Sequence, residues 1–159
     1  MNLSLNFRKL FVVFVACLTL TACAVQKKQS GMMQGDVYTG TDTVKYLAKG
    51  VADRVFFATN KSTLTTASRD TLRKQAAWMR KNKDVTVTLE GHADERGTRE
   101  YNLALGERRA NAAKDYLMTY GISGNRISVI SYGKERPVNP GSTPLAWSQN
   151  RRAVTVKVN

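Results

Sequence analysis

The stretch GHADERGTREYN (residues 91–102) carries the chain from a predicted strand into a predicted helix. Before it, residues 85–90 alternate between apolar and polar side chains, which is the pattern of a half-buried strand. After it, a helical period runs from about Glu100 to Tyr120 and meets Gly121, a residue type that readily ends helices. The charged side chains at this junction are therefore the first candidates for a functional site.

Further elements lie on both sides of this junction. Strands are predicted at residues 55–58, 127–132 and 154–158, and a helix should run from a Thr65 cap to about Lys81. The order β-α-β-α-β-β predicts an α+β fold, a two-layer sandwich in which helices pack on a mixed four-stranded sheet. In addition, residues 42–50 have the pattern of a short helix that begins at an Asp42 cap and stops at Gly50.

The N-terminus has the pattern of an export signal. Arg8 and Lys9 precede an apolar stretch, residues 10–20, which is well short of the roughly 20 residues that span a bilayer. The following run Leu20-Thr21-Ala22-Cys23 resembles a bacterial lipobox, so we expect cleavage after residue 22 and acylation of Cys23. The alternative is an ordinary secreted protein in which Cys23 is incidental or forms a disulfide. The other cysteine, Cys17, lies inside the signal and would be removed with it.

The chain is therefore expected to have three regions. Residues 1–22 are the signal peptide, residues 23–41 a polar and flexible linker, and residues 42–159 a single domain. Ala24 stands directly after the acylated position. Lipoproteins with Asp there tend to stay in the inner membrane, so by resemblance this one is expected in the outer membrane, facing the periplasm.

The chain is strongly basic, with 25 basic and 12 acidic residues and a formal net charge of +13. Removal of the signal takes away Arg8 and Lys9 and no acid, which leaves 23 minus 12, or +11. Such a charge attracts polyanions and anionic surfaces. Because an exported protein meets lipid headgroups and cell-wall polymer, we expect no nucleic acid partner.

Arg109 lies on the apolar face of the predicted second helix. A guanidinium on a core-facing stripe needs an anion, because an unpaired buried charge is very costly. Asp94, in the loop before this helix, is close enough in sequence to supply one. The pair could form a plain structural salt bridge. Alternatively, Asp94 could hold an ammonium while Arg109 holds a carboxylate, which would suit a zwitterionic amino-acid group.

A family resemblance is specific at these residues. Besides residues 91–102, the motifs are GERRA (residues 106–110), SYGKERP (residues 131–137) and NRRAV (residues 150–154). Together they resemble the peptidoglycan-associated lipoproteins of the Tol-Pal system, which carry an outer membrane protein A (OmpA)-like C-terminal domain. The resemblance covers about residues 51 to 158, and the lipobox and linker fit the same family.

The resemblance implies non-covalent binding of peptidoglycan through the diaminopimelate of its stem peptide, whose side-chain end carries an ammonium and a carboxylate. Asp94 and Arg109 fall on the family's two key ligand positions. The other site residues that it implies are Ala58, Thr59, Asn60, Asn102 and Leu105. Many members have an acidic residue at one of the positions held here by Ala58 and Asn60, so the charge of this pocket should differ. The implied protein partners are the Tol system's TolB propeller and TolA, in envelope integrity and cell division.

His92 is the only histidine of the chain. The sequence offers no Gly-x-Ser-x-Gly elbow and no second histidine to complete a nucleophile or metal set, so we expect a hydrogen-bonded structural histidine, no enzyme activity, no metal and no cofactor. Arg151 and Arg152 open the last strand, and alternation should place one against the fold and the other in solvent. A cell-wall enzyme and a purely protein-docking lipoprotein remain the alternative functions.

Overall fold

One mixed sheet organises the domain. The computed structural model describes residues 33–158. The strands of the main sheet, in the order β5-β8-β6-β7, are β5 (Arg54–Phe56), β8 (Arg152–Lys157), β6 (Val87–His92) and β7 (Ile127–Gly133). β6 pairs in parallel with β7, whereas β8 runs antiparallel between β5 and β6. The predicted α+β fold with a mixed four-stranded sheet is therefore confirmed.

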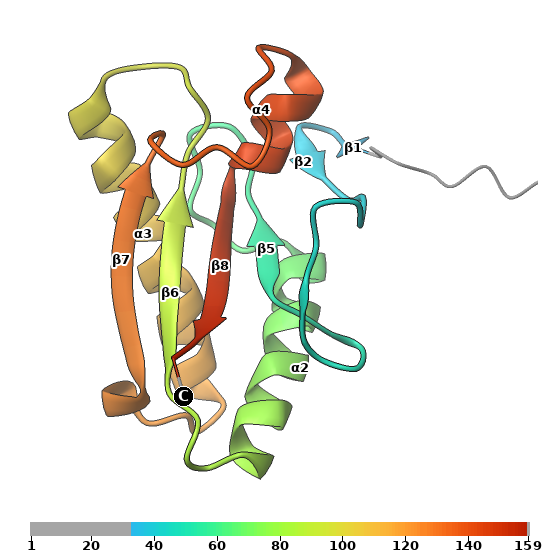
Figure 1. Cartoon of the computed structure of the whole chain (residues 1–159), viewed down its shortest axis with the longest axis vertical. Coiled ribbons are helices and arrows are strands. Elements are labelled where there is room, and N and C mark those ends of the chain that lie inside the picture. Colours follow the sequence, from blue (N-terminus) through green and yellow to red (C-terminus); the bar gives the residue numbers. More distant parts are fainter. Residues whose placement is uncertain (1–32, 159) are drawn as a thin grey trace, which may run out of the picture.

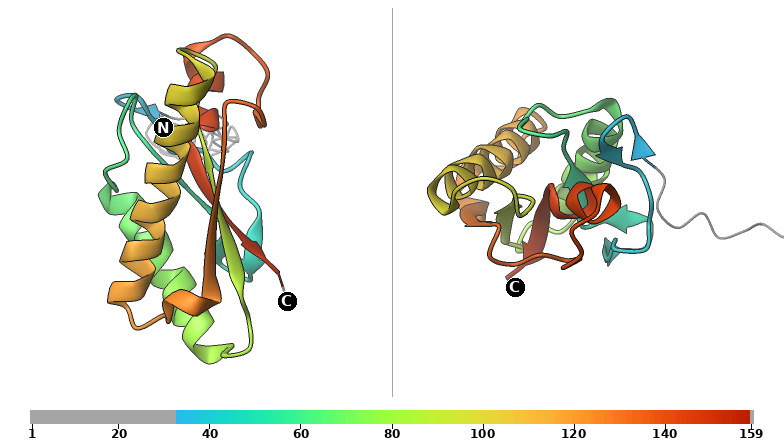
Figure 2. Two further views of the ribbon diagram at one scale, coloured as in Figure 1. Left: turned by 90° about the vertical axis from the view of Figure 1, so that its left-hand side faces the viewer. Right: turned by 90° about the horizontal axis from the view of Figure 1, so that it is seen from above.

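Two long helices cover one face of this sheet (Figures 1 and 2). They are α2 (Thr66–Lys81) and α3 (Arg99–Thr119). The side chains of Thr65 and Thr98 cap them by accepting the backbone N–H three residues on, and Gly121 follows α3 with a φ of 80°. The helices and the sheet enclose an apolar core, whose members include Phe57, Leu72, Met79, Val87, Leu89 and Leu117.

α3 crosses β6 at two glycines. A Cβ atom on Gly91 would lie 1.8 Å from the carbonyl oxygen of Gly106, and a Cβ atom on Gly106 would lie 2.9 Å from the carbonyl oxygen of Gly91. The backbones therefore touch directly, with no side chain between them. This contact brings the start of α3 close to the end of β6, where the candidate site lies.

Several small elements depart from the predictions. Residues 42–50 do not form a helix: β3 (Tyr46–Ala48) and β4 (Val51–Ala52) make a hairpin there. Gly50 has a φ of 76°, a conformation that occurs both after the end of a helix and in the turn of a hairpin. The predicted helix stop is therefore a hairpin turn. α4 (Pro144–Asn150) was not predicted, although Thr143 caps it and Pro144 occupies its first position. A 3₁₀ turn, η2 (Gly124–Arg126), precedes β7.

Two of the described strands lie before the predicted domain boundary at residue 42. β1 (Met33–Gln34) and β2 (Val37–Tyr38) pair as a hairpin within the range predicted to be linker. Tyr38 is buried and packs edge-to-face on Phe56, with ring centroids 4.8 Å apart. The linker prediction is therefore wrong for residues 33–41, because this aromatic contact holds the segment to the domain. Cys23 and the predicted signal lie outside the described residues.

Among residues 33–158, no helix is both long enough and apolar enough to cross a membrane.

Candidate functional site

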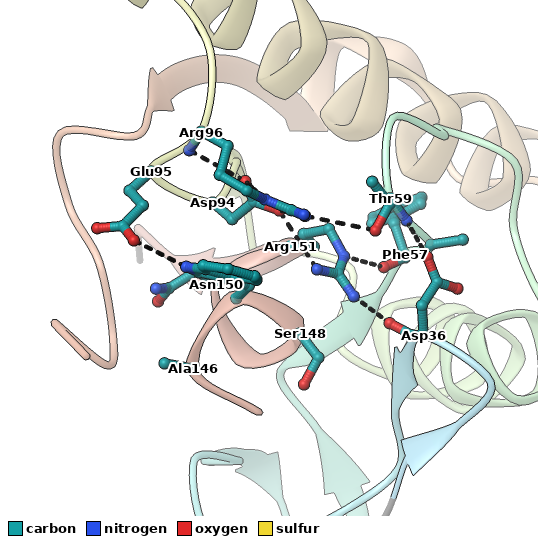
Figure 3. A network of polar contacts seen from close by, with 12 residues as sticks. Asp36, Phe57, Thr59, Asp94, Glu95, Arg96, Ala146, Ser148, Asn150 and Arg151 are labelled. Carbon is teal, nitrogen blue, oxygen red and sulfur yellow. Dashed lines mark hydrogen bonds and ion pairs between the residues drawn. The ribbon is translucent and has the colours of Figure 1, made fainter. Parts of the chain in front are cut away.

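Asp94 is the centre of a charged network at the end of β6 (Figure 3). Its Oδ1 accepts from the backbone N of Arg96 at 3.2 Å and from Arg96 Nε at 3.0 Å, and its Oδ2 accepts from Arg96 Nη2 at 2.7 Å. Arg151 adds an Nη1 contact to Oδ2 at 3.3 Å. Asp94 is buried, and both oxygens of its carboxylate accept hydrogen bonds from arginines.

These contacts keep Asp94 ionised. Burial by itself would raise its pKa, but the hydrogen bonds from Arg96, the charge of that guanidinium and the hydrogen bond from Arg151 outweigh burial and lower the pKa below its usual value. The site therefore contains a fixed negative charge at neutral pH, which is the group needed to hold a cation.

Arg109 is completely buried on α3, as its position on the apolar stripe predicted. Its guanidinium donates to three backbone carbonyls: Nε to Lys61 at 2.9 Å, Nη1 to His92 at 2.8 Å and Nη2 to Ala58 at 3.1 Å. It also lies over the ring of Phe57, 5.3 Å from the centroid. Arg109 thus ties the loop after β5 to the end of β6.

Arg109 forms no ion pair with a carboxylate of residues 33–158, and the plain salt bridge between Asp94 and Arg109 is therefore wrong. Asp94 pairs with Arg96 and Arg151 instead. Burial, and then the charge of Arg151, lower the pKa of Arg109 to about 10, which still leaves it charged at neutral pH. The fold thus buries a positive charge next to a loop without giving it a counter-ion.

The loop after β5 is a tight turn whose backbone carbonyls accept hydrogen bonds from Arg109. Lys61 N donates to the carbonyl of Ala58 at 3.2 Å, and Asn60 has a φ of 56°. Asparagine tolerates this left-handed conformation better than most residues do. Thr59 and Ala58 are half-buried and Asn60 is exposed. Of the three residues that the resemblance placed in the site, Ala58 contacts Arg109 directly, and Thr59 and Asn60 follow it in the same turn.

The two remaining predicted site residues support the site rather than line it. The Nδ2 of Asn102 donates to the carbonyls of Arg96 at 2.8 Å and Thr98 at 3.0 Å, which holds the loop between β6 and α3 in shape. Leu105 is buried with 3% of its surface exposed. Asn102 thus shapes the loop that carries Arg96, and Leu105 is part of the buried face of α3.

Other residues of the network were not singled out from the sequence. Arg96 lies within the motif of residues 91–102 and stacks on Trp147 of α4, 4.3 Å from the ring centroid. Trp147 Nε1 in turn donates to Glu95 at 2.8 Å. Asp36, in the turn between β1 and β2, accepts from Thr59 N at 2.5 Å. Arg96 could have been found from its position beside Asp94, but nothing in the sequence signals Asp36.

Arg151 and Arg152 are both buried, so the prediction that one of them stays in solvent is wrong. Arg151 ends α4, which covers it, and it donates through Nε to the carbonyl of Phe57 at 3.1 Å. Arg152 opens β8 and donates to the carbonyl of Arg136 at 3.1 Å. Strand alternation failed here because Arg151 lies outside the strand as the cap of α4, and because the segment at Arg136 contacts Arg152.

His92 is buried against Tyr132, with ring centroids 5.6 Å apart. Neither ring nitrogen has a hydrogen-bond partner among residues 33–158, so the prediction of a hydrogen-bonded histidine is wrong. Burial, followed by the charges of Arg152, Arg54 and Arg136, lowers its pKa to about 3. His92 is therefore a neutral, packed ring, and the carboxylate of Glu90 at 3.7 Å does not form an ion pair with it at neutral pH.

This histidine should make the domain sensitive to mild acid. Between pH 6.5 and about 3 the unfolded chain binds a proton at His92 that the folded domain does not, so stability falls as the pH falls. From pH 6.5 to pH 5 we expect a loss of about 2 kcal/mol from this residue. Chemical denaturation at both pH values measures it, and His92→Gln should flatten the profile. An equally steep profile in the variant would contradict this assignment, since the chain has no other histidine.

Within the described part of the chain, no three His, Cys, Asp or Glu side chains gather as metal ligands would. What the site does offer is a fixed carboxylate and a buried guanidinium on either side of one loop. These are the two charges that would complement a ligand carrying both an ammonium and a carboxylate.

Comparison with known proteins agrees with this architecture. Residues 56–151 match the model of the OmpA family. The chain is 45% identical over 149 residues to the peptidoglycan-associated lipoprotein of Rhizobium meliloti (strain 1021), covering 91% of this chain and 85% of the relative. It is 41% identical over 156 residues to that of Mesorhizobium japonicum (strain LMG 29417), covering 96% of this chain and 93% of the relative.

Solved structures have the same fold. The crystal structure of the peptidoglycan-associated lipoprotein from Burkholderia pseudomallei aligns with a TM-score of 0.65 and 34% identity, over 66% of this chain and 89% of that one. The C-terminal domain of Helicobacter pylori MotB aligns with a TM-score of 0.63 but 21% identity, over 67% of this chain and 84% of that one. The second likeness concerns the fold alone.

Proposed function

Since this chain belongs to the peptidoglycan-associated lipoproteins and carries an OmpA family domain, we propose that it binds peptidoglycan non-covalently through the diaminopimelate of the stem peptide. In this role it holds the outer membrane to the cell wall. Its action is binding, without catalysis.

One observation carries the proposal: Arg109 is a completely buried charge with no carboxylate partner among residues 33–158. A buried guanidinium without a counter-ion is costly unless an anion completes it. A guanidinium has five N–H donors, and the three carbonyl bonds use three of them. The diaminopimelate carboxylate would supply the missing negative charge.

The other end of the ligand would bind Asp94. Its carboxylate is ionised, buried and held rigidly by Arg151, whose side chain is only 3% exposed. The diaminopimelate ammonium would take the place of the Arg96 guanidinium, whose side chain is 42% exposed. Ala58, Thr59 and Asn60 would line the carboxylate side, with Asn102 and Leu105 supporting the loop and helix beneath.

Attachment to the membrane would come from Cys23. We propose that it is acylated and sorted to the outer membrane, so that the domain faces the periplasm. Because β1 starts at Met33, only nine residues, 24–32, lie between Cys23 and β1, a span of at most about 35 Å when extended. This tether is much shorter than one reaching to β5. Contacts with TolB and TolA, in envelope integrity and cell division, follow from the family resemblance.

The proposal is tested by sedimentation with purified sacculi. Asp94→Asn removes the charge that holds the ammonium, and we expect binding to weaken at least about tenfold. Asp84→Asn is the matched control, since Asp84 is exposed and precedes β6, whereas Asp94 follows it at the other end. Near-UV circular dichroism confirms that both variants are folded.

Equal sedimentation of the two variants would contradict the role of Asp94. Failure of the wild-type protein to sediment would favour the alternative, a lipoprotein that docks only periplasmic proteins. Release of soluble wall fragments during the assay would reveal an enzyme instead.

A further inference from the structure

The N-terminal hairpin reaches into the proposed binding site. We call residues 33–38 the strap; it consists of β1, the turn at Gly35 and Asp36, and β2. In Figure 3, Asp36 extends from this hairpin toward Thr59, on the opposite side of Arg151 from Arg96. The strap thus joins the region upstream of the domain to the pocket itself.

The contacts of the strap close a ring of five residues. Asp36 Oδ2 accepts from Thr59 N at 2.5 Å, and Thr59 Oγ1 accepts from Arg96 Nη2 at 3.5 Å. Arg96 is bound through two nitrogens to Asp94, which also accepts from Arg151. Arg151 Nη2 completes the ring by donating to the carbonyl oxygen of Asp36. Four separate segments of the chain therefore meet around Asp94 and Arg151.

The ring contains one anion and one cation, the two charges that a zwitterionic ligand would carry. The Asp36 carboxylate accepts a hydrogen bond from the backbone N–H of Thr59, in the loop whose Ala58 carbonyl Arg109 binds. Its negative charge also interacts with Arg151 and Arg96. The Arg96 guanidinium lies on the Asp94 carboxylate. A carboxylate thus lies beside the buried Arg151 and a cation lies on the buried Asp94, which is the charge pattern of the proposed ligand.

We propose that the strap closes the diaminopimelate site in the free protein, with Asp36 in the position of the ligand's carboxylate and Arg96 in the position of its ammonium. Binding then exchanges both internal groups for the two ends of the ligand. This inference rests on the proposed function and adds a regulation of the same site.

The way the strap is held suits such an exchange. β1 and β2 have two residues each, and residues 34–36 are exposed. Tyr38, by contrast, is buried against Phe56 and anchors the end of the hairpin nearest the domain. The turn can therefore lift from Thr59 while Tyr38 stays in place. Of the two arginines on Asp94, only Arg96 has an exposed side chain that can leave.

The test compares full-length wild type with Asp36→Ala in detergent, using a soluble muropeptide that contains diaminopimelate. When a site is closed for part of the time, its apparent affinity is the intrinsic affinity multiplied by the fraction of molecules that are open. We therefore expect the variant to bind about fivefold more tightly in calorimetry. Glu107→Ala is the control, since Glu107 is exposed on α3 and its removal changes the net charge equally. This control should bind like the wild type.

Hydrogen exchange gives a readout that needs no ligand. The Thr59 amide should exchange faster in Asp36→Ala than in the wild type, because its acceptor is gone. If the wild type binds the muropeptide and Asp36→Ala binds equally or more weakly, the strap proposal is overturned while the proposed function stands. If the wild type does not bind the muropeptide at all, the proposed function fails and the strap proposal fails with it.

Discussion

Gly91→Ala is expected to destabilise the domain by about 3 kcal/mol or more, because overpacking against backbone cannot be relieved by a side-chain rotation. The added Cβ would lie 1.8 Å from the carbonyl oxygen of Gly106 and 2.4 Å from its carbonyl carbon. α3 would have to move away from β6, and with it the start of α3 that supports the site. Thermal and chemical denaturation measure the loss.

Gly124→Ala is the matched control for this prediction. Its Cβ would meet only Met118, at 3.4 Å from Cε, and that side chain is flexible. We expect a change within about 0.5 kcal/mol. If the two variants have similar free energies of unfolding, the direct backbone contact between α3 and β6 is not as the structure has it.

Arg109→Met is expected to abolish sedimentation with sacculi and to cost about 2–4 kcal/mol of stability. The variant removes the guanidinium that donates to the carbonyls of Ala58, Lys61 and His92, and a buried carbonyl that loses its donor is costly. The loss of a buried charge offsets part of that cost. Sedimentation and denaturation are measured on the same protein.

Two controls separate binding from folding in the Arg109 prediction. Arg108→Met changes the net charge equally at the neighbouring position, where the side chain is exposed, and should bind nearly as the wild type does. Sacculi whose diaminopimelate carboxylate has been amidated should bind the wild type more weakly, since the ligand then lacks the anion. A folded Arg109→Met variant that sediments fully would refute the role of Arg109.

The main elements could be predicted because their signals are local. Thr65 and Thr98 cap helices, Gly121 ends one, and Val87 and Leu89 alternate with polar residues on a strand. These patterns depend on neighbours a few residues away, so they survive without knowledge of the fold. The hairpin at residues 46–52 was missed because Gly50 fits two local structures equally well, and only packing decides between them.

The candidate site was predictable only in part. Arg109 was expected to face the core and need an anion, and the structure buries it completely. Its partners could not be foreseen, because they are backbone carbonyls that lie 17, 48 and 51 positions away along the chain. The crossing of α3 over β6 helps to bring these segments together. Asp94 likewise pairs with Arg151, 57 positions along the chain.

By itself, the sequence determined the order of the four main-sheet strands and the two long helices, the core face of α3 and the residue types that a charged ligand would need. Local spacing suffices for these, since helical and strand periods are properties of short segments. The tertiary structure decided which charged side chains pair with one another. Asp36 carries no sequence signal and lies 23 positions from Thr59, yet the packing of Tyr38 on Phe56 brings its carboxylate onto that amide. Pairings at such separations depend on how the elements pack, which no local pattern records.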